Sequence, residues 1–281
     1  LLLCMTGLMG MTATGDAFNV FVFLEISSLS TYALIALGQD RRALTAAFQY
    51  LIMGTLGGTF ILISIGFLYA ATGTLNLADL AARLPLAENQ RAVQTAFAFF
   101  IVGISLKLAL FPLHLWLPNA YAYAPSVVTI FLAATATKVA VYVMLRFTFD
   151  LFGAHHAFAG VTLARVFPIL AGLDIILASL TALYQDHVKR RFAYSSVAQI
   201  GYIVLGIALM TPSGLTAGLL HIINHALAKG ALFMALGCLY YRLGSMSTSA
   251  LAGAAREMPL SAAAFVIAGL SLIGVPLTAG F

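Results

Sequence analysis

The protein has 281 residues, of which 62% are hydrophobic and only 8% are charged, and its mean hydropathy is +1.02. A water-soluble domain of this size cannot bury so much apolar surface, so the composition excludes a soluble protein and predicts a bilayer around the chain. The formal charge of +5 does not indicate a nucleic-acid partner, because the ten Arg lie in loops or at helix ends. Three of the four Lys instead lie inside apolar segments: Lys107, Lys138 and Lys229.

Apolar segments of membrane-spanning length follow one another along almost the whole sequence. A transmembrane helix needs about 20 predominantly apolar residues. We count seven full-length candidate segments, and two more apolar runs, 1–12 and 259–281, lie at the ends of the sequence. We therefore predict an all-α fold, a polytopic bundle of transmembrane helices. The seven expected spans are 17–38, 44–71, 95–117, 126–147, 166–184, 192–211 and 215–240.

The segment between the second and third expected spans is too polar to cross a bilayer. Within residues 72–94, apolar side chains recur at helical spacing from Leu77 to Leu84, which predicts a short amphipathic helix at the membrane interface. In the span before it, Gly54 and Gly58 form a GxxxG step. Such a step is typical of close helix packing and does not by itself indicate a mechanism.

Two stretches resemble each other in a way that predicts an internal repeat. Both 103–118 and 269–281 begin Gly-x-Ser-Leu and continue to a proline inside an apolar segment, at Pro112 and Pro276. A proline removes a backbone donor, and interrupted helices at matching positions of two halves are typical of inverted-repeat transporters. We expect one transmembrane domain built from two inverted repeats with Pro-broken helices. The first repeat is expected at about 1–147 and a partial second repeat at about 166–281.

The two ends of the sequence predict a piece of a longer protein. Leu1 is not an initiator Met, and Phe281 lies within an apolar run. The first repeat carries Lys107, whereas Ile273 stands at the matching position of the second. Because a second half needs its own protonatable group, we expect one beyond Phe281.

The ionisable residues inside the expected spans are the strongest functional signal. Each charge near the middle of a bilayer costs at least about 2.5–3.5 kcal/mol, so such residues are retained for pairing or for use. Glu25 is followed by several hydroxyl side chains, and Lys107 precedes the break at Pro112. We predict that Glu25 and Lys107 form a pair whose separation releases a proton. The alternative is a static ion pair that fixes helix packing.

Three further residues in the spans allow more than one interpretation. Lys138 lies midway along its span, so we interpret it as a relay site; its depth disfavours a side chain that reaches to the membrane surface. Asp174 can pair with Lys138, line a cation path, or stay protonated and hydrogen-bonded in the interior. His114 follows the break and is either an accessory proton carrier or a hydrogen-bonded core residue.

His221, His225 and Lys229 stand at i, i+4 and i+8 and therefore form one stripe along a single helix. Histidine changes charge near neutral pH, so this stripe suits a proton path. Both histidines can alternatively be packing residues, and an i, i+4 pair can also bind a metal. No third ligand lies nearby in the sequence, and Cys4 and Cys238 form no cluster, so we expect no metal site and no cofactor.

The loops indicate an orientation and contain two ambiguous groups. If 17–38 runs inward, the cytoplasmic loops hold seven Lys and Arg against four on the other side, which favours this orientation by the positive-inside rule. Asp16 and Asn19 can cap their helix or mark an ion entrance. His155 and His156 lie in a loop, where we expect them to be solvated.

Four ordered motifs resemble the membrane subunits shared by NADH–quinone oxidoreductase (complex I) and the Mrp-type cation/proton antiporters. The resemblance covers essentially the whole chain. It implies Glu25 and Lys107 as a coupling pair, Lys138 as a relay, and the His221 to Lys229 helix as the continuation of the path. The first motif is more similar to the Mrp-type D protein than to the complex I subunits. The motifs are TGDAFNVFVFLE (14–25), LKLALFPLHLWLPNAYAYAP (106–125), QDHVKRRFAYSSVAQIGY (185–202) and HIINHALAKGALF (221–233).

The resemblance implies a proton-conducting subunit of an Mrp-type antiporter that exchanges protons for Na⁺. The nearest alternative is the equivalent proton-pumping subunit of complex I or of a membrane-bound hydrogenase. Either interpretation implies other membrane subunits as partners and a multi-pass position in the cell's inner (plasma) membrane. A quinone- or haem-binding redox enzyme is disfavoured, because the sequence carries no dinucleotide glycine motif and no haem or cluster cysteines. A passive assembly scaffold is disfavoured by the charges in the spans.

Overall fold

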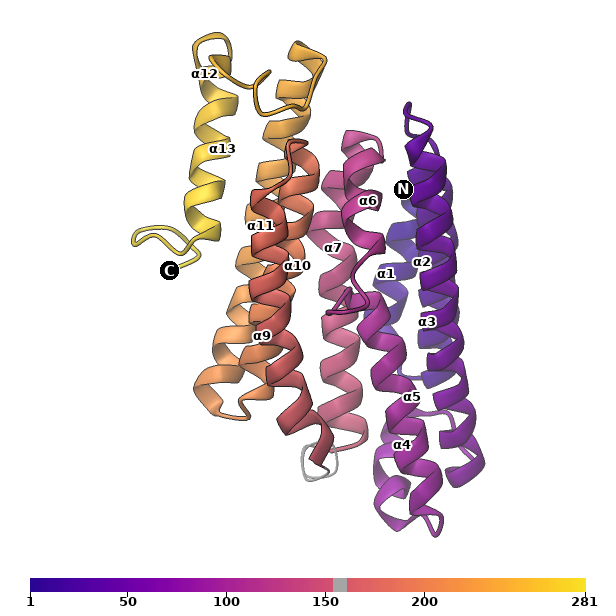
Figure 1. Cartoon of the computed structure of the whole chain (residues 1–281). Helices are drawn as coiled ribbons and strands as arrows, with labels where there is room; N and C mark the ends of the chain where they lie inside the picture. The colour runs from indigo at the N-terminus through magenta and orange to yellow at the C-terminus, as the bar shows by residue number, and fades with distance from the viewer. Residues whose placement is uncertain (154–160) are drawn as a thin grey trace.

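The computed structural model describes residues 1–153 and 161–281, and this part of the chain folds as a bundle of long helices (Figure 1). The predicted all-α class is confirmed. His155 and His156 lie outside the described residues. The principal helices are α1 (Leu2–Ala13), α2 (Ala17–Ala36), α3 (Arg42–Thr72), α4 (Leu77–Arg83), α5 (Gln90–Leu108), α6 (Trp116–Tyr123), α7 (Ser126–Leu145), α9 (Val161–Leu183), α10 (Val188–Ala208), α11 (Pro212–Leu243), α12 (Ala254–Glu257) and α13 (Pro259–Leu272).

Six of these helices are long and apolar enough to cross a membrane. They are α2, α3, α5, α7 with the π-helical turn Arg146–Leu151 that follows it, α9 and α11. The remaining predicted span, 192–211, corresponds to α10, which is long enough but more polar than the other six. Its polar residues face α11, as described below, so α10 depends on protein rather than lipid for much of its surroundings. The chain is therefore a multi-pass membrane protein.

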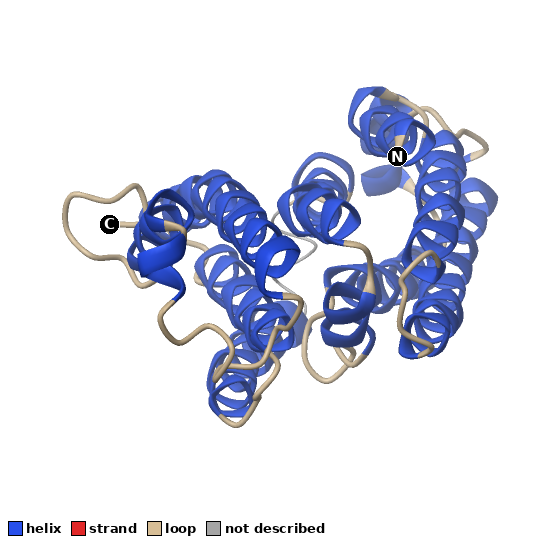
Figure 2. Ribbon diagram, turned by 90° about the horizontal axis from the view of Figure 1, so that it is seen from above, coloured by secondary structure: helices blue, strands red, loops and turns tan. Residues whose placement is uncertain are grey.

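The helices form two groups with a connection between them (Figure 1). Helices α1 to α5 lie in one group, in which α3 packs along both α2 and α5. Helices α9 to α13 lie in the other, in which α11 packs along both α10 and α13. Helices α6 and α7 lie between the groups, and α7 contacts α1 and α5 on one side and α11 on the other. The view from above shows helices lying between the two groups (Figure 2), and the contacts of α7 make it the connection between them.

Two predicted runs are interrupted close to the predicted proline breaks, and one helix begins earlier than predicted, each for a local reason. The expected span 95–117 is interrupted, because α5 ends at Leu108, where Ala109 adopts a left-handed conformation with φ of 59°, and Pro112 follows without an N–H donor. The run 259–281 is helical only as far as Leu272. Helix α10 begins at Val188 rather than 192, because the His187 side chain caps it and the basic residues continue the first turn.

The predicted interfacial helix is present as α4, which Asn76 caps. At the start of α2, Asp16 Oδ1 accepts a hydrogen bond of 2.8 Å from the Asn19 amide, so Asp16 caps this helix. An isolated antiparallel bridge joins Asp16 to Asn76, and a second one joins His187 to Ser247. Each bridge ties the start of one long helix to the segment that follows the next long helix, and this places α2–α3 and α10–α11 in similar surroundings.

Candidate functional site

Glu25 on α2 and Lys107 on α5 face each other in the first helix group. The Lys107 ammonium lies 3.8 Å from Glu25 Oε1 and donates a hydrogen bond of 2.8 Å to Ser28 Oγ. Ser28 in turn donates to the Leu24 carbonyl at 2.8 Å, which orients its oxygen toward the lysine. The side chains of Lys107 and Glu25 are 10% and 24% exposed, so the pair lies largely out of solvent. The two residues that the sequence predicts to pair are thus brought together.

The helix break directly follows Lys107, and Trp116 stabilises it. Its buried indole N–H donates to the Leu106 carbonyl at 2.9 Å, which satisfies an acceptor at the end of α5. His114, also buried, lies in the turn between α5 and α6. Its ring stacks on Phe111 at 5.7 Å and meets the Tyr194 ring of α10 edge-on at 6.5 Å. The break therefore contacts both helix groups.

A cavity of about 40 Å³ lies beside Lys107. Ser28, Tyr50, Lys107 and Trp116 line it on one side, and α7 lines it on the other. This volume exceeds the roughly 10–15 Å³ that a water molecule requires, and the lysine and hydroxyl groups supply polar partners. The cavity therefore lies between Lys107 and α7, the helix that carries Lys138.

Lys138 is buried at the middle of α7, with 7% of its surface exposed. Its ammonium donates to the Ala133 carbonyl of its own helix and lies 3.4 Å from Thr137 Oγ1. It does not reach the surface, as expected from its depth. Helix α7 packs against α11, the helix that carries His221, His225 and Lys229. Lys138 thus stands between the first helix group and the α11 stripe.

His221 and His225 on α11 lie one above the other with parallel rings, 6.0 Å apart at an interplanar angle of 6°. Nε2 of His221 lies 2.5 Å from Oε1 of Gln199 on α10. The Gln199 amide lies 3.5 Å from the Leu272 carbonyl at the end of α13, next to the second break. His225 is fully buried, and neither of its ring nitrogens has a hydrogen-bond partner among the described residues.

Lys229 is fully buried at the far end of the α11 stripe. Its ammonium donates to the Phe192 carbonyl at 2.8 Å and to Ser195 Oγ at 2.5 Å, both on α10. The Phe192 and Phe233 rings lie 5.5 and 5.9 Å from the same nitrogen. These contacts let a cation exist without a carboxylate partner, because carbonyl and hydroxyl oxygens and aromatic faces all stabilise positive charge.

Asp174 on α9 does not pair with Lys138 within the described chain. The carboxyl group is fully buried, and both of its oxygens lack a well-formed hydrogen bond there. The backbone N–H of Phe111, in the first break, is the donor that faces it. Asp174 also packs on Gly201 of α10. It therefore touches the break rather than the lysine. Pro276, at the second break, is exposed.

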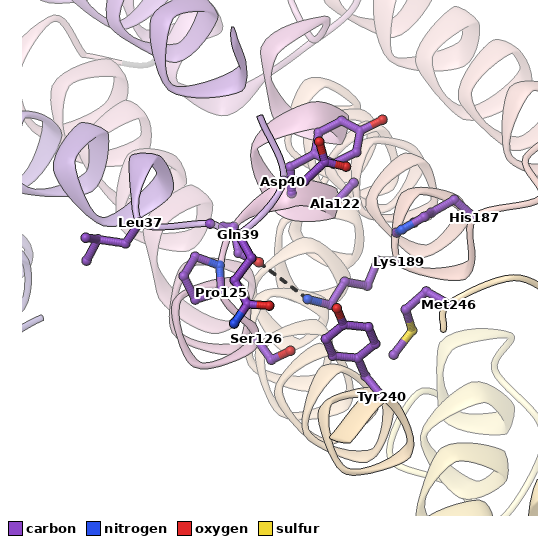
Figure 3. Close-up of a pocket in the computed structure, with 13 residues that line it drawn as sticks. Leu37, Gln39, Asp40, Ala122, Pro125, Ser126, His187, Lys189, Tyr240 and Met246 are labelled. Atoms are coloured by element: carbon purple, nitrogen blue, oxygen red, sulfur yellow. Dashed lines mark hydrogen bonds between the residues drawn. The ribbon is translucent and has the colours of Figure 1, made fainter. Parts of the chain in front are cut away.

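A polar pocket of about 310 Å³ opens where α2, α6 and α10 meet the end of α11 (Figure 3). Lys189 projects into it, 5% exposed, with its ammonium 3.4 Å from the Ala124 carbonyl and 5.7 Å from the centre of the Tyr240 ring. Burial lowers the pKa of His187 in this pocket, and the neighbouring Lys189 and Arg190 cations lower it further. Lys189 precedes Phe192, whose carbonyl holds Lys229, so the pocket adjoins the end of the stripe.

The neutral residues that complete these contacts were not predicted as site residues from the sequence. Ser28, Trp116, Ser195 and Gln199 each bond to a predicted residue or to the break, and Lys189 falls in an expected loop. A signal was present, because Ser195 and Gln199 stand at i, i+4 on one face of α10. Polar side chains at that spacing in a span indicate a facing polar stripe.

The fold and these contacts define a class: a multi-pass helical membrane protein with a buried series of ionisable residues across two helix groups. Residues 14–281 match the family model described as NADH:quinone oxidoreductase/Mrp antiporter, TM, and the chain belongs to this family. The resemblance predicted from the four motifs is confirmed.

Individual relatives span both branches of the family. The chain is 47% identical over 280 residues to the N subunit of NADH-quinone oxidoreductase from Desulforudis audaxviator, covering 100% of this chain and 55% of that protein. It is 32% identical over 277 residues to the D subunit of the Na⁺/H⁺ antiporter from Alkalihalophilus pseudofirmus, covering 99% and 55%. In the structure of the membrane-bound sulfane sulfur reductase, an archaeal respiratory membrane complex, a chain matches with a TM-score of 0.89 and 38% identity, covering 98% of this chain and 56% of that one. The chain thus spans about half the length of these relatives, and the expected greater similarity to the Mrp-type D protein is not confirmed.

Proposed function

We propose that the protein conducts protons as an antiporter-like subunit of a multisubunit membrane complex. The observation that carries this proposal is the set of ionisable groups inside the bundle: the Glu25–Lys107 pair beside a water-sized cavity, Lys138 on the neighbouring α7, and the stripe on α11, which packs against α7. Buried ionisable residues in membrane spans mark ion and proton pathways. Family membership supports the same function.

In this proposal each group has a distinct task. Glu25 stabilises the charged form of Lys107, and a change in their separation lets the lysine release its proton into the adjacent cavity. Lys138 receives it, and His225 with His221 passes it along α11 to Lys229. His114 and Asp174, which both contact the break after Lys107, act as accessory groups there.

The finer assignment separates two candidates. The sequence motifs favour an Mrp-type antiporter that exchanges protons for Na⁺, and the similarity to the A. pseudofirmus Na⁺/H⁺ antiporter protein supports this candidate. The higher identity to an NADH-quinone oxidoreductase protein supports a redox-driven complex. Both imply other membrane subunits as partners, and we propose the plasma membrane as the site of the complex.

Reconstitution of the whole complex tests the proposal and separates the two candidates. With a pH-sensitive dye inside vesicles, an Mrp-type antiporter moves protons when a Na⁺ gradient is imposed. A redox-driven complex moves protons when an electron donor and a quinone are added. If protons move under neither condition, the proposed function is wrong.

A further inference from the structure

Glu25 rests directly on the backbone of α3. A Cβ atom built at Gly58 would lie 2.2 Å from Glu25 Oε1 and 3.2 Å from Glu25 Cδ. Ordinary contacts between carbon and oxygen need roughly 3.4 Å, so the carboxylate occupies space that any other residue at this position would fill. The same Oε1 is buried and has no hydrogen bond among the described residues, so its position depends on the lysine and on this contact.

Gly57, the residue before Gly58, packs near Lys107, the other member of the pair. A Cβ atom at Gly57 would lie 3.1 Å from the Gly103 carbonyl oxygen of α5 and 3.5 Å from Lys107 Cε. Successive residues of a helix point about 100° apart, so these two glycines face two different neighbours. Gly58 packs against Glu25 of α2, and Gly57 packs against α5 near Lys107.

In the second helix group, the ionisable side chain stands on the other helix of the equivalent pair. Helix α3 ends at Gly73 and α11 at Gly244, both with positive φ, three residues before the isolated bridges at Asn76 and Ser247. Counted back from these landmarks, Gly58 corresponds to Lys229. At this register the first group therefore has a long ionisable side chain on α2 and a glycine on α3. The second places one on α11, opposite a serine of α10.

We propose that Gly58 is a positioning residue that sets the separation between Glu25 and Lys107, an inference that rests on the proposed function of this pair. At 3.8 Å the pair is at the limit of direct ionic contact, and Ser28 fixes the ammonium. A methyl group at position 58 forces the carboxylate to retreat by roughly 1 Å. The retreat is outward, because the interior is packed while 24% of the Glu25 side chain is accessible. The distance between the Glu25 carboxylate and the Lys107 ammonium then exceeds the limit of direct ionic contact, so the two groups stabilise each other's charge less.

Gly58→Ala tests this inference in the full-length protein within its complex, with Gly66→Ala as the matched control on the same helix. A Cβ atom at Gly66 meets no described atom within 4 Å. Labelling of Glu25 by a hydrophobic carbodiimide, quantified by mass spectrometry of its peptide, reports on the acid, because this reagent attacks protonated carboxyls. We expect labelling to rise at least threefold and transport to fall at least tenfold in Gly58→Ala, and neither to change in Gly66→Ala.

Shortening the acid supplies the rescue. In the double variant Gly58→Ala with Glu25→Asp, the carboxyl group no longer overlaps the new methyl, so labelling should return toward the wild-type value and transport should exceed that of Gly58→Ala. If Gly58→Ala does not assemble, the same double variant should restore assembly. Labelling of Gly58→Ala equal to that of Gly66→Ala, or a double variant no better than Gly58→Ala, overturns the inference. Labelling does not depend on transport, so this result can be read even if the proposed function fails.

Discussion

Replacement of Glu25 by Gln removes the charge that faces Lys107 while preserving shape. At a separation of 3.8 Å and an effective dielectric constant of about 20, the attraction amounts to about 4 kcal/mol. This free energy favours the charged lysine by roughly a thousandfold. The bond from Lys107 to Ser28 is weaker, since a hydrogen bond to a charged group contributes about 1.5–3 kcal/mol. Glu25→Gln should therefore impair the pair more than Ser28→Ala.

Proton uptake into vesicles that contain the whole complex measures this difference. We expect Glu25→Gln to lower the rate at least tenfold, and Ser28→Ala to lower it by a smaller factor. Ser30→Ala is the matched control, because the Ser30 hydroxyl donates to the Ile26 carbonyl of its own helix and does not contact the lysine. Wild-type transport in Glu25→Gln, or a larger loss in Ser28→Ala, would refute the reasoning and make the pair a packing element.

Three other predictions follow from single contacts. His225→Ala should slow proton movement more than His221→Ala, because His225 lies between both neighbours on the stripe; equal, mild effects would make both packing residues. Trp116→Phe removes the indole donor from the Leu106 carbonyl, which keeps only the Ala109 N–H at 3.3 Å, and should destabilise the protein by about 0.5–1.5 kcal/mol, read as a lower Tm; an unchanged Tm argues against this cap. Burial and neighbouring cations lower the pKa of His187, so acidification below the unfolded value of about 6.5 should destabilise the start of α10. Amide protection factors there, which correct for the slower intrinsic exchange in acid, should be lower at pH 5 than at pH 7; unchanged protection, or the same loss in His187→Asn, would contradict this sign.

The helical class and the approximate spans followed from composition and apolar run length alone. The boundaries that differ depend on local conformation. The end of α5 is set by the left-handed Ala109, and alanine carries no sequence signal for that state. The start of α10 reads as a loop because of its basic residues, yet they occupy a helical first turn beside a pocket.

The candidate site likewise contains some partners that the sequence could predict and others that it could not. Glu25 and Lys107 were predictable as partners because two opposite charges in apolar spans each require compensation. The partners of Lys229 were not predictable, because they come from α10 and depend on how α10 and α11 are aligned. Asp174 shows the limit most clearly. Its sequence position allowed a lysine partner, a cation path or a protonated interior group, and packing on Gly201 directs it toward the break at Phe111.

The most direct test of the central claim is the rate of proton movement in vesicles containing the complex with Lys229→Met. Lys229 is fully buried and bonded to α10, and methionine keeps its apolar length while removing the titratable group. Cys238→Ser, at an exposed position of the same helix, is the control. A proton path through α11 predicts that Lys229→Met loses at least nine-tenths of the wild-type rate while Cys238→Ser retains it. An assembled Lys229→Met complex that conducts protons at the wild-type rate would contradict this account.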